Sequence, residues 1–224
     1  MYAIEAVKLY KSYKAGVLNV EVLKGIDMQI QAGEFISIMG PSGSGKSTFL
    51  YLAGGLDNPT SGTVRINGSN IPEMNDRELS IMRRRSIGFI FQFYNLIPNL
   101  SVEENIMLPA MLDGNKAIDL KKTLKELVDI TGLARRIQHF PAELSGGEQQ
   151  RTAIARALIN DPAIILADEP TGNLDTENGT GILELLKRIS RERGKTIIMV
   201  THSAEAAVYS QRTVFMKDGR LVEQ

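Results

Sequence analysis

The sequence has 224 residues, 43% of them hydrophobic, which is enough for one domain with a sizeable core. Its 26 basic residues balance 26 acidic ones, so the chain lacks the basic excess of a dedicated nucleic-acid-binding protein. Cysteine is absent, which excludes disulfide frameworks and thiolate metal sites. The sequence contains neither an apolar run of about 18 residues nor a signal-peptide pattern, and we therefore expect a soluble, cytoplasmic protein.

The first part of the chain predicts a small antiparallel β layer. Residues 3–9 and 20–30 are predicted strands, and apolar and polar residues alternate again over 64–67, as in a half-buried strand. The Asn-Gly pair that follows is a strong turn signal. Tyr13 lies in the predicted link between the first two strands, where its ring either stacks on a purine or packs against the protein.

A phosphate-binding loop lies between an apolar run that predicts a buried strand and a second one that predicts a helix. Its glycines let successive backbone N–H groups point at one anion, and the helix adds the positive end of its dipole. We predict that Lys46 reaches the β- and γ-phosphates of a nucleotide and that the Ser47 hydroxyl binds Mg²⁺. The loop fits the pattern G-x-x-x-x-G-K-[S/T] and comprises Gly40, Pro41, Ser42, Gly43, Ser44, Gly45, Lys46, Ser47 and Thr48.

The middle of the chain changes to a helical pattern. An apolar strand at 87–91 ends at Gln92, whose side-chain carbonyl can bind Mg²⁺ if it lies beside the phosphates. From about residue 93 to residue 160 the pattern predicts a helical lobe inserted between strands of the main sheet. The aromatic and apolar cluster at 91–97 fits either core packing or a docking surface for a partner helix, and the residues alone leave both open.

A second anion-binding feature occurs at residues 144–148. Ser145 and Glu148 fit a capping box, so a helix is predicted to begin here and run to residue 160. Gly146 and Gly147 leave the backbone N–H groups of the first turn accessible. Two phosphate-type helix starts in one chain are unusual for an ATPase that binds a single nucleotide.

Two acidic residues follow the apolar run 163–167, which reads as a central parallel strand. Because ligands of open α/β sheets lie beyond the carboxyl ends of strands, Asp168 is placed to hold Mg²⁺. Glu169 is placed to orient and polarise an attacking water, a role worth roughly 10²- to 10⁴-fold in rate. A helix is predicted at 176–193, and the next core strand ends at His202, which can donate to a γ-phosphate.

Taken in order, these motifs resemble the nucleotide-binding subunit of ATP-binding cassette transporters over essentially the whole chain. The resemblance makes Gln92 the Q-loop residue, 144–148 the signature, 164–169 the Walker B motif and His202 the switch histidine. It makes Tyr13 the adenine-stacking aromatic and Asp175 the D-loop aspartate. The implied fold is an α/β P-loop NTPase with a mixed, mainly parallel central sheet. It carries an N-terminal antiparallel β layer and a helical subdomain at about 93–160, within one domain of residues 1–224.

The resemblance also implies a mechanism and partners. Two copies would pack head to tail, so that the phosphate loop of one and the signature of the other clamp the same ATP with Mg²⁺. The implied catalytic residues are Lys46, Glu169 and His202. An integral membrane permease would be a separate chain and would hold the protein on the inner face of the membrane; no nucleic-acid partner is expected. Nucleotide contacts across the pair would come from Ser145, Gly146, Gly147, Glu148 and Asp175.

Longer segments at 54–62, 91–98 and 168–175 resemble the lipoprotein-releasing and macrolide-exporter branch, which includes ATPases of antimicrobial-peptide resistance. The expected function is therefore a motor subunit for an exporter or extractor of lipoprotein, peptide or drug-like substrates. Ser203 departs from the family's usual aspartate but leaves His202 intact.

Three alternative functions share parts of this sequence pattern. The first is a mechanotransmission ATPase that drives a periplasmic or cell-wall partner without moving a substrate. The second is a soluble cassette ATPase of DNA repair or translation, which the single cassette, the lack of a long coiled-coil insertion and the neutral charge all disfavour. The third is a nucleotide sensor that does not hydrolyse ATP.

Overall fold

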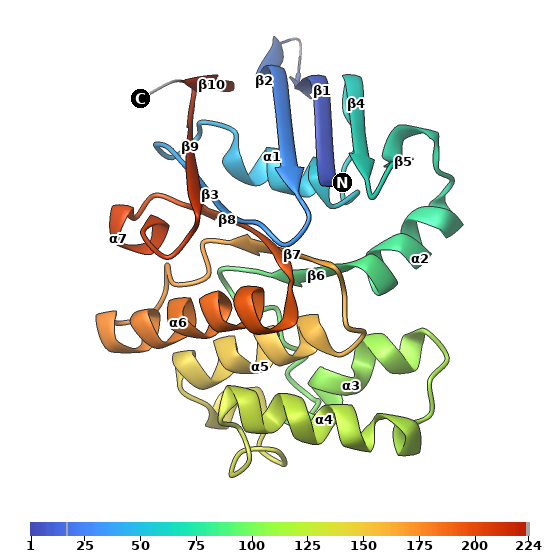
Figure 1. Cartoon of the computed structure of the whole chain (residues 1–224), viewed down its shortest axis with the longest axis vertical. Helices are drawn as coiled ribbons and strands as arrows, with labels where there is room; N and C mark the ends of the chain where they lie inside the picture. The colour runs from blue at the N-terminus through green and yellow to red at the C-terminus, as the bar shows by residue number, and fades with distance from the viewer. Residues whose placement is uncertain (17, 223–224) are drawn as a thin grey trace.

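The computed structural model describes residues 1–16 and 18–222 (Figure 1). The strands are β1 (Tyr2–Ala15), β2 (Leu18–Gln31), β3 (Phe35–Met39), β4 (Ser61–Ile66), β5 (Ser69–Asn70), β6 (Ile87–Ile90), β7 (Ile164–Asp168), β8 (Thr196–Thr201), β9 (Arg212–Lys217) and β10 (Arg220–Val222). The α-helices are α1 (Lys46–Ala53), α2 (Asp76–Ser86), α3 (Val102–Leu112), α4 (Ala117–Thr131), α5 (Gly146–Leu158), α6 (Thr176–Arg193) and α7 (Ala204–Ala207). Two 3₁₀ turns are η1 (Ile71–Glu73) and η2 (Pro141–Glu143).

The strands form two sheets. An antiparallel sheet has the order β2-β1-β4-β5, and a six-stranded sheet has the order β10-β9-β3-β8-β7-β6. In the larger sheet β9, β3, β8, β7 and β6 are mutually parallel, and β10 alone runs antiparallel as the second strand of the final hairpin. The predicted fold class, a mainly parallel central sheet with an antiparallel layer, is confirmed.

The large sheet separates two hydrophobic cores, because successive side chains of a strand point to opposite faces. In β7, Ile164 and Leu166 pack in the core shared with β1, β2, β4 and α1, whereas Ile165 and Ala167 pack in the core shared with α3, α4, α5 and α6. Figure 1 shows the same arrangement, with the antiparallel sheet and α1 above the central sheet and the long helices below it. Burial on both faces explains why the central strands are continuously apolar rather than alternating.

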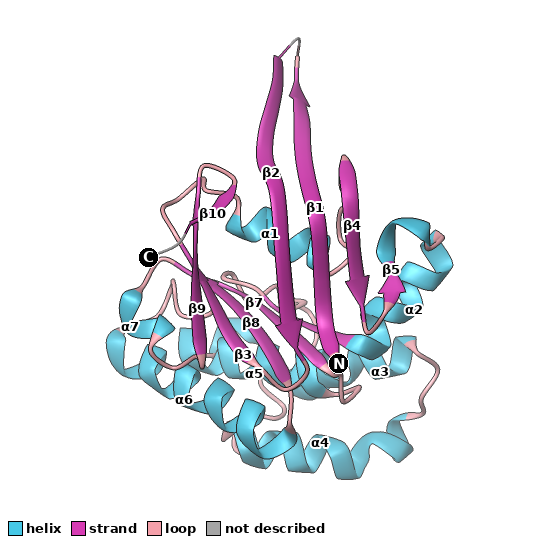
Figure 2. Cartoon of the chain, turned by 45° about the horizontal axis from the view of Figure 1, so that its top comes forward, coloured by secondary structure: helices cyan, strands magenta, loops and turns pink. Residues whose placement is uncertain are grey.

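The hairpin of β1 and β2 is longer than the sequence predicts. Its two strands of 14 residues project well beyond the rest of the antiparallel sheet (Figure 2). Tyr13 pairs with Val20 inside this hairpin, so the prediction that it lies in a link between strands is wrong. The sequence does not predict the extension, because its side chains lie outside the two hydrophobic cores and no alternation of buried apolar and exposed polar residues marks it.

The helical predictions agree closely with the structure. Helix α6 has the predicted bounds, and capping boxes begin α2, α3 and α5 at Asn75, Ser101 and Ser145. Helices α3, α4 and α5 all fall within the predicted lobe and pack against one another. Among the described residues, no helix is both long and apolar enough to cross a membrane.

Candidate functional site

A cavity of about 880 Å³ opens where β3, β6, β7 and β8 end, and most of the predicted site residues line it. This is the edge of a parallel sheet at which ligands bind in open α/β folds. The predicted residues that meet here are Ser42, Gly43, Gly45, Lys46, Ser47, Thr48, Gln92, Asp168, Glu169 and His202.

The phosphate loop has a backbone that only glycine can adopt. Gly45 has φ of 102°, and a Cβ atom there would lie 2.8 Å from the Leu23 side chain. It is the N-cap of α1 without a side-chain cap, so the first N–H groups of the helix stay available to a ligand. Gly40 and Ser44 are not among the residues that line the cavity; a Cβ atom on Gly40 would overlap the carbonyl of Met216 on β9.

Lys46 is nearly buried, with 7% of its surface exposed, and curls over its own loop. Its Nζ donates to the carbonyl oxygens of Gly40 at 2.8 Å and Pro41 at 2.9 Å. An ammonium group has three donors, so one more N–H can serve an anion in the cavity. The loop therefore holds the lysine charge in place before any ligand arrives.

Asp168 accepts two hydrogen bonds from α1. Ser47 Oγ donates to Oδ1 at 2.8 Å, and the Tyr51 hydroxyl donates to Oδ2 at 2.9 Å. Burial and the neighbouring Asp168 carboxylate raise the pKa of Tyr51 to about 12, so the phenol remains a donor at neutral pH. Sequence reasoning missed Tyr51, although its position four residues after Ser47 places both side chains on one face of α1.

Glu169 and His202 lie side by side at the mouth of the cavity. His202 Nδ1 is 3.0 Å from Glu169 Oε1, and 68% of the His202 side chain is exposed against 15% of Glu169. Glu169 has φ of 45°, an unusual backbone for a non-glycine residue and one that clusters at functional sites. The turn after β7 therefore aims this carboxylate toward the strand end that carries the histidine.

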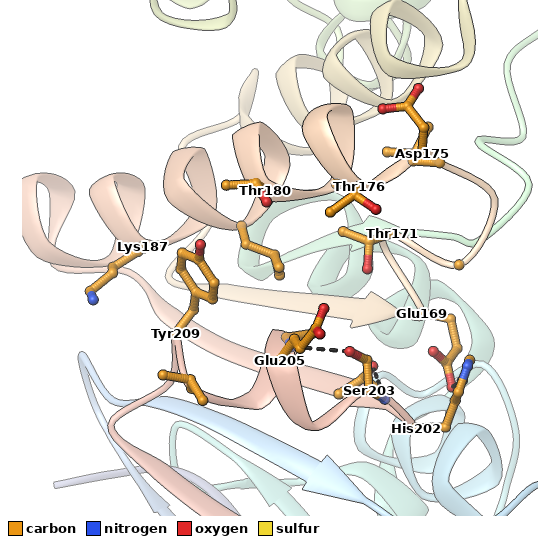
Figure 3. Close-up of a pocket in the computed structure, with 17 residues that line it drawn as sticks. Glu169, Thr171, Asp175, Thr176, Thr180, Lys187, His202, Ser203, Glu205 and Tyr209 are labelled. Carbon is orange, nitrogen blue, oxygen red and sulfur yellow. Dashed lines mark hydrogen bonds and ion pairs between the residues drawn. The ribbon is translucent and has the colours of Figure 1, made fainter.

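A second cavity, of about 680 Å³, shares Glu169 and His202 and extends between α6 and α7. Figure 3 shows these two side chains at one end and Lys187 and Tyr209 at the other. Asp175 lines this second cavity and not the first, and its carboxylate caps α6 by accepting from the Asn178 N–H at 2.9 Å.

The signature residues lie apart from the phosphate-loop cavity, since none of residues 145–148 lines it. Ser145 Oγ accepts from the Glu148 N–H at 3.3 Å, and the Glu148 carboxylate accepts from the Ser145 N–H at 2.8 Å, which confirms the capping box. Arg136 donates to Glu148 at 2.7 Å, and this bond, with that from Ser145, lowers the pKa of Glu148 to about 2. A Cβ atom on Gly147 would overlap Asn178 of α6, so close packing requires a glycine there.

The segment after Glu169 connects the two regions within the chain. Asn173 donates to the backbone carbonyl of Gln92 at 2.9 Å, and the buried Gln150 of α5 donates to the Pro170 carbonyl at 2.7 Å. Sequence reasoning missed Asn173 and Gln150, because no short-range pattern links them to partners 81 and 20 residues away.

The cluster at 91–97 does not form a core. Phe93 is 71% exposed and Ile97 is 40% exposed, whereas Phe91 stacks on Phe89 with ring centroids 5.6 Å apart. A separate groove of about 320 Å³ runs beside this cluster, between α2, β6, α3 and α5. Of the two interpretations that the sequence left open, the exposure of these side chains disfavours core packing.

Tyr13 is not among the residues that line the phosphate-loop cavity. Its hydroxyl donates to Asp57 Oδ2 at 2.7 Å, and 40% of its surface is exposed. Burial and the Asp57 carboxylate raise the pKa of Tyr13 to about 12, although the nearby Thr48 hydroxyl acts in the opposite direction. The hydroxyl is therefore held by Asp57 near Thr48 of α1, and the residue remains partly open to solvent.

Comparison with known proteins agrees with this geometry. A family model described as ABC transporter matches residues 23–172. The chain is 49% identical over 218 residues to an ABC transporter ATP-binding protein of Thermotoga maritima, covering 97% of this chain and 93% of that protein. It is 48% identical over 219 residues to the lipoprotein-releasing system ATP-binding protein LolD of Geobacter metallireducens, covering 98% and 97%.

A solved structure is similar over the same length. The ATP-binding cassette MJ0796, in a dimeric post-hydrolysis state bound to ADP and Pi, matches with a TM-score of 0.91 at 43% identity, over 98% of this chain and 97% of that one. Because the family model spans more than half of the chain and the relatives cover nearly all of it, the protein belongs to the family of ATP-binding cassette (ABC) transporter ATPases.

Proposed function

We propose that two copies of this ABC ATPase close around two ATP molecules and drive a separate integral membrane permease. The observation that carries the proposal is the separation of two nucleotide-binding features in one chain, with the signature turn outside the phosphate-loop cavity. A second copy, packed head to tail, would bring its own signature to that cavity and complete it. The dimeric state of the MJ0796 cassette, which is 43% identical, supports this arrangement. Residues 1–224 would act as one nucleotide-binding domain with a helical subdomain at about 93–160.

Each half of the closed site would have its own task. The loop from Gly40 to Thr48, Lys46 in particular, would bind the phosphates, and Tyr13 would stack on the adenine. From the second copy, Ser145, Gly146, Gly147 and Glu148 would approach the γ-phosphate, with Asp175 at the interface. The Ser145 hydroxyl already accepts from Glu148, and this use leaves its own O–H free to donate to a phosphate. Capping its helix and binding ATP are therefore compatible.

The residues at the base of the cavity have the donor chemistry for Mg²⁺. Ser47 Oγ and Asp168 Oδ1 are 2.8 Å apart, close to the spacing of adjacent oxygens around an octahedral ion with ligands at about 2.1 Å. Gln92 supplies a third oxygen in the same cavity. When bound there with ATP, Mg²⁺ would neutralise charge on the phosphates. Among the described residues no three His, Cys, Asp or Glu side chains converge to hold a metal, so a magnesium ion here would depend on the Asp168 carboxylate together with the hydroxyl, the amide and the phosphates.

Hydrolysis would use the pair at the mouth of the cavity. Glu169 would orient the attacking water and accept its proton, while His202, 3.0 Å from that carboxylate, would donate to the γ-phosphate. Lys46 would stabilise the charge on the transferred phosphoryl group. Loss of the γ-phosphate would remove a ligand shared by both copies, and the dimer would reopen.

The groove beside the 91–97 cluster is the proposed contact with the permease. Phe91 and Asn95 line both this groove and the phosphate-loop cavity, on either side of Gln92. A helix docked in the groove would therefore share two residues with the nucleotide site. This contact would hold the protein in the cytoplasm at the inner face of the membrane.

The substrate class proposed is lipid-anchored protein, extracted from the membrane. The support is the similarity to LolD proteins, named for a lipoprotein-releasing system, at 48% and 45% identity in two bacteria. Peptides and drug-like molecules are the other substrates that we propose for an exporter of this kind.

The Glu169→Gln variant tests the motor. We expect it to bind ATP with near-native affinity and to release phosphate at least roughly 100-fold more slowly than the wild type, because the water loses its base. Size-exclusion chromatography should show an ATP-dependent dimer of the variant that dissociates when ADP replaces ATP. A variant that turns over normally, or stays monomeric with ATP bound, would refute the proposal.

Reconstitution then separates transport from force transmission alone. Proteoliposomes with the co-purifying permease should displace a lipid-anchored protein in proportion to ATP hydrolysed. Hydrolysis without displacement of any of the proposed substrates would favour mechanotransmission.

A further inference from the structure

The segment after α1, from Leu56 to Thr60, is attached to strand β1 by several hydrogen bonds. The Thr60 N–H donates to the Tyr10 carbonyl at 2.9 Å, and the Thr60 hydroxyl accepts from the Ser12 N–H at 2.9 Å. Asp57 and Asn58, earlier in the segment, contact the side chain of Lys11. The segment is thus fixed against the part of β1 that carries Tyr13. The nucleotide site proposed above assigns no role to any residue of this segment.

Lys11 is a charged residue with 8% of its surface exposed, and its ammonium group makes two hydrogen bonds and one contact with an aromatic ring. Its Nζ donates to Asp57 Oδ1 at 2.6 Å and to the Asn58 carbonyl at 2.7 Å. The same atom lies 4.6 Å from the centroid of the Tyr13 ring, within the range of a cation–π contact. One face of the ring is therefore covered by an ammonium group.

Asp57 completes the arrangement by holding the other end of the tyrosine. Its Oδ2 accepts from the Tyr13 hydroxyl at 2.7 Å, and its Oδ1 accepts from Lys11. Burial alone would raise the pKa of Asp57, but the bonds from Lys11 and Tyr13 lower it below its ordinary value. The carboxylate is thus charged at neutral pH and fixes both the phenol and the ammonium.

We propose that Lys11 and Asp57 are positioning residues for the nucleobase: they fix the plane of Tyr13 and leave one ring face for a purine. The inference rests on the proposed stacking role of Tyr13. With the lysine over one side of the ring and the phenol hydrogen donated to Asp57, the opposite face is the one that we propose takes the base by stacking. A ring fixed beforehand binds more tightly than a free one, because its rotamer entropy is lost in folding rather than in binding.

Equilibrium binding of two ligands tests this without hydrolysis: ADP, which carries the base, and inorganic pyrophosphate, which does not. Tyr13→Ala should weaken ADP binding by roughly 5- to 150-fold, the range for loss of one base–aromatic stack. Lys11→Met and Asp57→Asn should each weaken ADP by roughly 2- to 10-fold, the range for one side chain left free to rotate. Pyrophosphate affinity should stay unchanged in all three variants.

A double-mutant cycle distinguishes positioning from a general structural role. In the Tyr13→Ala background, Lys11→Met and Asp57→Asn should cause no further loss of ADP affinity, because there is no ring left to position. With Tyr13 present, Lys11→Arg keeps a cation over the ring and should therefore retain most of the ADP affinity that Lys11→Met loses. The matched control is Lys195→Met, since Lys195 is equally buried and paired with Asp161 at 2.8 Å, directly before β8 in the other sheet.

Several results would overturn the inference. It fails if Lys11→Met and Asp57→Asn still weaken ADP binding in the Tyr13→Ala background. It also fails if pyrophosphate binding weakens as much as ADP binding, or if Lys195→Met weakens ADP binding to the same extent. It fails alone if Tyr13→Ala weakens ADP while Lys11→Met and Asp57→Asn do not. If Tyr13→Ala binds ADP like the wild type, the stacking role fails together with the inference.

Discussion

A single side chain, Glu148, illustrates how this protein uses its charged residues. The carboxylate accepts from Arg136 at 2.7 Å and from the Ser145 N–H at 2.8 Å, so one group closes the helix cap and forms an ion pair. The hydrogen bond from Arg136 is the largest cause that lowers the pKa of Glu148, from an ordinary value of 4.5 to about 2. The start of the signature helix is therefore sensitive to acid.

The Glu148→Gln variant should show this as a change in pH dependence. Because the folded pKa is below the unfolded one, the unfolded chain binds more protons between them. The stability that Glu148 contributes is thus complete above about pH 4.5 and is lost as the pH falls toward about 2. Glutamine keeps a capping-box partner for Ser145 but cannot titrate.

Urea unfolding at about pH 6 and about pH 3 measures the effect. The free energy of unfolding should fall less between these values in Glu148→Gln than in the wild type. Glu184→Gln, at an exposed position of α6, is the control and should match the wild type. An unchanged pH dependence in Glu148→Gln would contradict the assignment.

At the scale of elements, α5 connects the signature to the rest of the molecule. It begins at Ser145, packs on α3 and α4, and reaches the segment after β7 through the bond from Gln150 to Pro170. The cap and the proposed contact with the second copy's ATP share one residue. Separating these two roles requires a substitution that keeps the cap.

Ser145→Asp is such a substitution, because aspartate caps helices as well as serine does. We expect its free energy of unfolding to stay within about 0.5 kcal/mol of the wild type, whereas Ser145→Ala should lose about 1 kcal/mol. The added negative charge should repel the γ-phosphate, so ATP-dependent dimerisation and hydrolysis should be lost while ATP binding to the single subunit remains. Chemical denaturation, nucleotide binding and phosphate release measure the three effects, and full activity of Ser145→Asp would argue against a site completed by the second copy.

At the scale of the whole molecule, the phosphate-loop cavity and the proposed permease groove are neighbours that share Phe91 and Asn95. The segment around Gln92 separates them, and Asn173 holds the Gln92 backbone from the side of Glu169. Movement of this segment on ATP binding would displace residues that line the groove. The proposed coupling between ATP and the permease therefore needs only a short path.

Filling the groove should separate permease docking from ATP hydrolysis. Ser80 lines the groove from α2 and is not among the residues that line the phosphate-loop cavity, so Ser80→Trp should block docking while basal ATP hydrolysis persists. Capture from detergent-solubilised membranes should recover the permease with the wild type and with the control Lys121→Trp, at an exposed position of α4, but not with Ser80→Trp. Equal recovery by Ser80→Trp would place the permease contact elsewhere.

Much of the molecule could be predicted from short stretches of sequence. The ends of α6 follow from local signals, with Asp175 as the cap and Gly194 in the left-handed conformation that ends the helix. The phosphate loop and the two acids at the end of β7 could be predicted equally well, because each lies next to an apolar run that fixes its place at the end of a strand.

The sequence by itself therefore determined the family, the limits of α6, the starts of the capped helices and the residues at the strand ends, since capping, glycine backbone and periodicity act over a few neighbouring residues. Only the tertiary structure decided that Tyr51 contacts Asp168 and that Tyr13 lies within a long hairpin and contacts Asp57. These contacts join residues separated by 117 and 44 positions. They depend on how the sheets and helices pack, and packing at that range leaves no local pattern in the chain.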